Sequence, residues 1–165
     1  MTQHDRLEGL LVDLREAASK GDEARCPSLA AFIKEARRHL ELESAIFYPT
    51  VAPRLILVEA APLLEEHATL HIGLDRLEAA GQAGGSEFDL AWEKLHEQLV
   101  IHLSDEEIEL FPEVRRRFDI DELDALGERM ERSLEHESPA EQPVAEPAQV
   151  QQDGPQQPTP DQPQH

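Results

Sequence analysis

Two stretches of the chain, HLELESAIFYP at 39–49 and HLSDEEIELFP at 102–112, decide the fold. They align without gaps at an offset of 63 residues, and each runs from a His-x-x-x-Glu pair to an aromatic residue followed by proline. The same offset aligns HDRLEGLLVDL at 4–14 with HATLHIGLDRL at 67–77, which share one histidine and three leucines. Because a single offset superposes both pairs of segments, the sequence predicts two copies of one helical hairpin.

Helical periodicity dominates residues 1–137, where apolar residues recur at spacings of three and four and no useful length alternates with a period of two. The pattern predicts four long helices, at about 2–20, from 27 or 28 to 49, at 62–81 and from 86 past 112. A short fifth helix is expected after Asp119 or Asp121, either of which could cap it. Short connections favour an all-α fold, an antiparallel up-down-up-down four-helix bundle of two repeated hairpins with a C-terminal appendage.

Composition changes sharply near Ser138. Residues 138–165 contain seven Pro and eight Gln but no Lys or Arg. Such a segment has too little apolar surface to offset the entropy lost on folding, so we expect a disordered acidic tail. The folded domain is accordingly assigned to residues 1–137.

The charge balance and the single cysteine exclude several classes of protein. With 35 Asp+Glu against 15 Lys+Arg, the net charge of −20 argues against binding to nucleic acid or to an anionic membrane. Cys26 alone can form neither an internal disulfide nor a cysteine-based zinc or iron–sulfur site, and we interpret it as an incidental thiol. Since no targeting or membrane-spanning segment is visible, a cytoplasmic protein is expected, and a monomer is compatible with the sequence.

Polar residues interrupt the apolar stripes of the four predicted helices. Seven titratable side chains lie on these stripes: His4, His39, Glu43, His67, His71, His102 and Glu106. Buried carboxylates cost several kcal/mol each unless they are compensated, and no Lys or Arg lies on the same faces. Metal ions would satisfy all seven groups, although a lone buried histidine is usually an ordinary core residue. Seven donors suit two ions, and oxygen and imidazole donors without thiolate favour iron or manganese.

On these residues the chain resembles the hemerythrin-like (HHE cation-binding) family, and the match covers essentially all of residues 1–112. The resemblance implies a non-haem di-iron centre bridged by an oxo or hydroxo oxygen and by two carboxylates, those of Glu43 and Glu106. It further implies that one iron is bound by His67, His71 and His102, and the other by His4 and His39. The second iron would then keep a position open for an exogenous ligand.

The resemblance leaves several functions open. The first is binding or sensing of dioxygen, or of a similar small ligand such as nitric oxide. The alternatives are a redox enzyme acting on peroxide or nitric oxide, an iron-binding or storage protein, and a metal that only stabilises the fold. Two residues bear on the choice: Glu8 could close the open position, and Tyr48 is a conceivable proton donor that we expect to pack at a helix end. Glu106 also follows its histidine at +4, whereas oxygen-carrying hemerythrins have Asp at +5, so reversible oxygen carriage does not follow automatically.

Overall fold

The computed structural model describes residues 3–55, 60–83 and 85–136. Within these ranges the chain is helical and contains no strand, which confirms the all-α prediction. Most of the described residues belong to four long helices: α1 (Gln3–Lys20), α2 (Asp22–Leu42), α4 (Ala60–Ala83) and α5 (Gly85–Asp105). None of the helices described is long and apolar enough to cross a membrane. The predicted tail, 138–165, lies outside the described residues.

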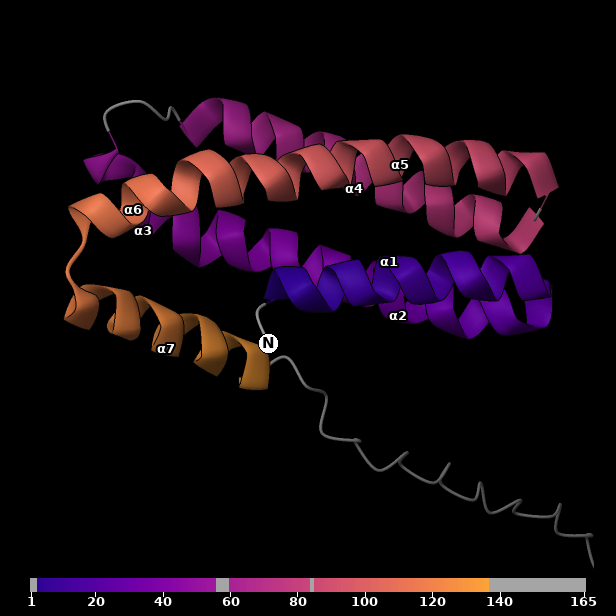
Figure 1. Cartoon of the computed structure of the whole chain (residues 1–165), viewed down its shortest axis with the longest axis horizontal. Coiled ribbons are helices and arrows are strands. Elements are labelled where there is room, and N and C mark those ends of the chain that lie inside the picture. Colours follow the sequence, from indigo (N-terminus) through magenta and orange to yellow (C-terminus); the bar gives the residue numbers. More distant parts are fainter. Residues whose placement is uncertain (1–2, 56–59, 84, 137–165) are drawn as a thin grey trace, which may run out of the picture.

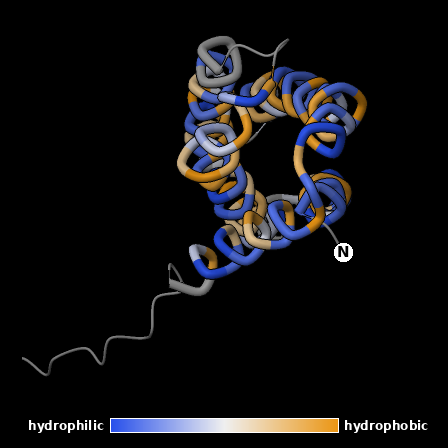
Figure 2. The backbone as a smooth tube through the Cα atoms, turned by 90° about the vertical axis from the view of Figure 1, so that its left-hand side faces the viewer, coloured by the Kyte–Doolittle hydropathy of each residue, from blue (hydrophilic) through white to orange (hydrophobic). Residues whose placement is uncertain are grey.

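The long helices lie lengthwise beside one another (Figure 1). α1 packs against α2, α4 against α5, and α2 against α4. The view along the helices in Figure 2 shows them arranged around a common centre. Buried leucines and aromatic residues fill that centre, among them Leu7, Phe32, Leu74 and Leu99.

The turn between the first two helices is tighter than the sequence suggests. α2 begins at Asp22, five residues before the expected start at Pro27. Pro27 therefore lies inside the helix, in its second turn. Gly21 has a φ of 108°, a backbone conformation that only glycine adopts readily, so the chain reverses direction at this one residue.

Both His-x-x-x-Glu segments end in a short π-helix. η1 (Glu43–Phe47) follows α2 and η3 (Glu106–Leu110) follows α5, so the offset of 63 residues extends to the backbone. In each, a backbone N–H donates to the carbonyl oxygen five residues earlier. The N–H of Tyr48 donates to Glu43, and the N–H of Phe111 donates to Glu106. The following prolines have no N–H and cannot continue the regular helical ladder. The α-helices α3 (Tyr48–Val51) and α6 (Phe111–Arg117) then resume, α3 being followed by the 3₁₀ turn η2 (Ala52–Arg54).

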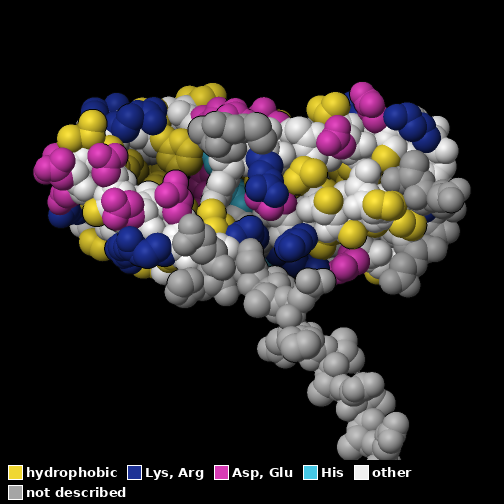
Figure 3. Space-filling view, turned by 90° about the horizontal axis from the view of Figure 1, so that it is seen from below, with side chains coloured by type: hydrophobic (Ala, Val, Ile, Leu, Met, Phe, Trp, Pro, Cys, Tyr) yellow, Lys and Arg dark blue, Asp and Glu magenta, His cyan; other side chains and the backbone are white. Residues whose placement is uncertain are grey.

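The C-terminal helix α7 (Ile120–His136) begins at the end of the molecule where α3 and α6 are found and runs roughly lengthwise along one side, back towards the N-terminus (Figure 1). It covers a second, smaller core of buried residues that includes Phe47, Tyr48, Val114 and Leu126. Asp119 caps it: its carboxylate accepts from the backbone N–H of Glu122 at 2.9 Å, and the Glu122 carboxylate accepts from the N–H of Asp119 at 3.1 Å. This reciprocal pair is a capping box. The surface beside α7 is hollowed, and histidine side chains are visible in the hollow (Figure 3).

Candidate metal centre

Six of the seven candidate ligands meet inside the molecule, close to where the π-helices begin. They are His4 at the start of α1, His39 near the end of α2, Glu43 in η1, His67 in α4, His102 in α5 and Glu106 in η3. Each has at most 5 % of its surface exposed. Their donor atoms form two groups with spacing suited to metal binding: one contains His4, His39, Glu43 and Glu106, and the other Glu43, His67 and His102. Glu43 belongs to both groups.

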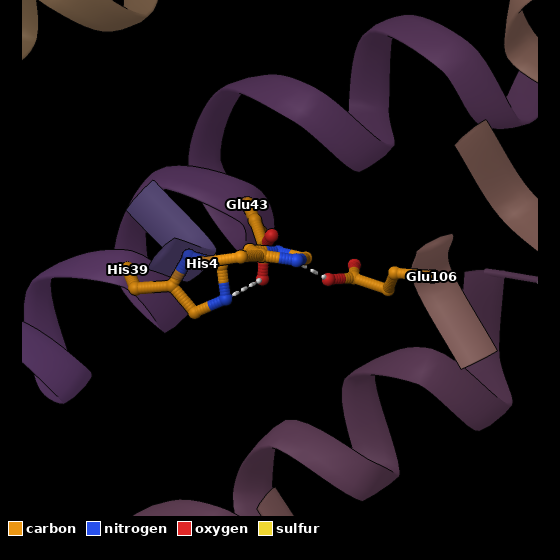
Figure 4. A group of neighbouring side chains, drawn as sticks. All are labelled: His4, His39, Glu43 and Glu106. Carbon is orange, nitrogen blue, oxygen red and sulfur yellow. Dashed lines mark ion pairs between the residues drawn. The ribbon is translucent and has the colours of Figure 1, made fainter. Parts of the chain in front are cut away.

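The four imidazoles direct Nε2 at carboxylate oxygens. Oε2 of Glu43 lies 3.3 Å from His39, 3.5 Å from His67 and 3.6 Å from His102. Oε2 of Glu106 lies 3.2 Å from His4 and 3.7 Å from His102. Figure 4 shows the first group, with His39 facing Glu43 and His4 facing Glu106.

Four of these converging atoms are buried and have no hydrogen-bond partner in the described structure: Nε2 of His39 and His102, and Oε2 of Glu43 and Glu106. An unsatisfied buried polar group costs about 1–3 kcal/mol, and a charged one more. The four atoms are one nitrogen and one oxygen from each His-x-x-x-Glu pair. Such an arrangement is what a cation-binding cavity requires and what an ordinary core avoids.

The protonation states of two histidines suit metal binding. Burial lowers the pKa of His39 to about 3 and that of His67 to about 4. Both rings are therefore neutral at neutral pH and can offer a lone pair.

The two carboxyls differ from each other. Burial, reinforced by the nearby charge of Glu106, raises the pKa of Glu43 well above its usual range. Burial by itself would also raise the pKa of Glu106, but contacts with His4, His102 and Tyr48 lower it to about 2. Glu106 is thus held as a carboxylate, whereas Glu43 keeps its proton to a higher pH than an ordinary glutamate does.

A second layer of side chains contacts Nδ1, the other ring nitrogen of each imidazole. Nδ1 of His4 lies 3.0 Å from Glu107, Nδ1 of His67 lies 2.9 Å from Ser44, and Nδ1 of His39 lies 3.2 Å from Gln3. Nδ1 of His102 lies 3.9 Å from Glu66, at ion-pair distance. Such partners fix the ring orientation of metal-binding histidines. None of these four partners was predicted from the sequence, although the offset of 63 relates Gln3 to Glu66 and Ser44 to Glu107.

Tyr48 belongs to the site and does not merely pack at a helix end. Its hydroxyl donates to Oε1 of Glu106 at 2.6 Å and lies 3.1 Å from Nε2 of His67. Burial raises the pKa of the phenol, so that it remains a proton-bearing donor. The equivalent residue in the other half is Phe111, whose ring packs against His4 with the centroids 5.3 Å apart. The two halves therefore differ by one hydroxyl group at this position.

His71 and Glu8, which the offset relates to each other, do not join the six. His71 is half-buried one turn after His67 and belongs to neither donor group, and Glu8 is exposed on α1. Without His71, each half of the centre contributes two histidines and one glutamate.

Comparison with known proteins finds no family, no curated protein and no solved structure that matches this chain.

Proposed function

We propose that the chain is a hemerythrin-like, non-haem di-iron protein whose four long helices form an antiparallel up-down-up-down bundle. One observation carries the proposal: two His-x-x-x-Glu pairs bury four nitrogen and oxygen atoms that face one another and have no hydrogen-bond partner among the described residues. An antiparallel bundle explains why the starts of α1 and α4 meet the ends of α2 and α5 at one level. In the described structure, the ion pairs of Glu43 and Glu106 are with histidines and not with Lys or Arg, so a bound cation would balance the charge of Glu106 and that of Glu43 once it loses its proton.

The donor set favours two ions over one. His4 and His39 would hold one iron, His67 and His102 the other, and Glu43, which both donor groups share, would bridge them with Glu106. Nitrogen and carboxylate donors without thiolate are typical of non-haem iron. Since six side chains do not fill the coordination of two such ions, positions remain for an exogenous ligand. When bound, iron would supply reversible binding of dioxygen or a similar small molecule.

The first test is the metal content of protein purified without a metal-affinity tag. We expect about two irons per chain and a new visible charge-transfer band on adding azide. His102→Ala should lose most of the iron, because it removes a buried donor. His96→Ala is the matched control, since His96 is on the same helix but packs against Trp92. One zinc per chain without an azide band, or an unchanged iron load in His102→Ala, would overturn the proposal.

A second candidate function, reductive turnover of peroxide or nitric oxide, is favoured by the Tyr48 hydroxyl. A reaction that reduces either ligand consumes electrons from an added reductant and protons from solvent, and this hydroxyl, which donates to Glu106, would relay those protons to the centre. Tyr48→Phe makes this position match its repeat equivalent, Phe111. If the protein is an enzyme, the variant should keep its iron and lose most of its turnover. If it is a carrier, peroxide will persist with both proteins and only the lifetime of the bound ligand will change.

A further inference from the structure

The helices α4 and α5 form the side of the molecule opposite α7, and their outer surface carries exposed apolar side chains (Figure 1). Ile72 on α4 and Leu90 and Ile101 on α5 are each more than half exposed. Single exposed apolar residues are common, but these three lie beside a groove of about 490 Å³ between the two helices. Gly73 lines the groove, and an added Cβ there would lie 2.9 Å from Cδ1 of Leu95, so the helices approach closely at this level. We call this surface the α4/α5 face.

Along α5 the face has a stripe of four exposed residues, Leu90, Lys94, Glu97 and Ile101. Their spacings of four, three and four residues keep them on one side of the helix. Read in either direction, the stripe has an apolar residue at each end and two opposite charges in the middle. The α5 helix of a second copy, running antiparallel, would therefore place Leu90 against the partner's Ile101 and Lys94 against the partner's Glu97.

The charges of the α4/α5 face suit self-association. Because the chain has a net charge of −20, most surfaces of two copies repel each other. On this face, however, Arg76 and Lys94 accompany Glu97, and none of the three has an ion pair within the described residues. A further acid at the groove, Glu66, lies 3.9 Å from Nδ1 of His102. Two copies could thus exchange ion pairs that one chain does not make.

The first hairpin does not repeat this surface. At the positions equivalent to the stripe, the offset of 63 residues places Pro27, Ala31, Lys34 and Arg38. Since only one hairpin carries the stripe, two copies would meet through the same patch of each chain. Such a pairing closes as a twofold dimer and leaves no second patch from which a longer assembly could grow.

We propose that the chain forms a twofold-symmetric dimer through the α4/α5 face, with the two α5 helices antiparallel. The centre of this pairing lies between residues 95 and 96, level with Gly73, so the partner's Ile72 would enter the groove. The hollow beside α7, which His4 and His39 line, lies on another side of the molecule and stays open in the dimer. The inference does not depend on bound iron.

Sedimentation equilibrium of the purified protein tests the dimer, and a charge swap tests its geometry. Lys94→Glu and Glu97→Lys should each weaken association about tenfold, because like charges then face each other across the twofold axis. The double variant Lys94→Glu/Glu97→Lys restores opposite charges at this position and should recover most of the affinity.

Ile101→Glu should dissociate the dimer, because it places a charge against the partner's Leu90 in a surface removed from water. Val12→Glu is the matched control: Val12 is 58 % exposed on α1, outside the α4/α5 face, and the variant should remain a dimer. Circular dichroism establishes that each variant is folded.

The inference is overturned if the unaltered protein is a monomer up to about 100 μM. It is also overturned if Val12→Glu weakens association as much as Ile101→Glu does, or if the double variant associates no better than the single variants. None of these results bears on iron binding, which the metal content tests separately.

Discussion

Each of the four buried histidines has two ring nitrogens in different roles. Nε2 faces the carboxylates of the centre, and Nδ1 faces an outer side chain such as Gln3 or Glu107. An acceptor at Nδ1 favours the tautomer that carries its proton there and leaves the Nε2 lone pair free. Gln3 thus prepares the His39 ring for metal binding before any ion arrives, whereas His4, which faces a carboxylate at each nitrogen, must first lose a proton.

Removal of His71 should distinguish a ligand from a neighbour. Because the structure leaves His71 half-buried and outside both donor groups, His71→Ala should retain about two irons per chain. His67→Ala, one turn earlier on the same helix, should lose iron. Iron assay of the two purified variants decides the matter. Equal loss in both would mean that His71 is a ligand, as the family resemblance implies.

Metal binding should release protons, and metal affinity should fall as the pH falls. Contacts with Glu106 and Glu107 outweigh burial and raise the pKa of His4, and burial raises that of Glu43. Both groups hold their protons to higher pH than usual and must lose them to bind a cation. His39 and His67 are already neutral above about pH 4 and contribute little.

Calorimetry with Mn²⁺, a redox-stable probe, in two buffers of different ionisation enthalpy measures this release. At pH 6 we expect net proton release together with weaker binding than at pH 7.5. Binding without proton release, or affinity that increases on acidification, would contradict the protonation states described above.

Among the elements, the paired π-helices are the feature that sequence periodicity could not predict. A helical pattern assumes 3.6 residues per turn, and one extra residue per turn hardly disturbs it over five residues. The prolines at 49 and 112 indicated only that each helix ends or bends. The structure shows that the regular ladder breaks at Glu43 and at Glu106, the two carboxylates of the centre. π-Helical segments are frequently found at functional sites.

Six donors of the centre could be predicted from the sequence, because helical spacing places them on the apolar stripes of their helices. His71 lies four residues after His67, a step that rotates its position around the helix by about 40°. Whether a side chain at that position is buried depends on how the neighbouring helices pack. The reach of the Tyr48 hydroxyl across to Glu106 is likewise a property of packing between helices. Neither could be derived from spacing along one helix.

The capping box of α7 offers a test confined to one element. Asp119→Ala removes the carboxylate that accepts from the backbone N–H of Glu122 and should destabilise the protein by about 1 kcal/mol. Iron content should stay the same, since Asp119 lies outside the donor groups. Urea unfolding of the iron-loaded variant measures the change. Asp121→Ala, which removes an acid from the first turn without removing the cap, is the control, and equal destabilisation by both would argue against the box.

At the scale of the whole molecule, the two halves repeat their inner residues and differ in what surrounds them. On one side of the centre, Tyr48 and Ser44 from the first repeat lie beside His67 from the second. On the other side, Phe111 and Glu107 from the second repeat lie beside His4 from the first, next to the hollow beside α7. The repeat could be predicted because one offset aligns its helices. The inequivalence could not, since it arises from α7 and from contacts between the hairpins.

Anomalous diffraction at the iron edge, from crystals of iron-loaded protein, would show whether the six buried side chains hold two metal ions. We expect two strong peaks, one beside His4 and His39 and the other beside His67 and His102, with Glu43 between them. A single peak, or peaks outside this set of residues, would contradict it.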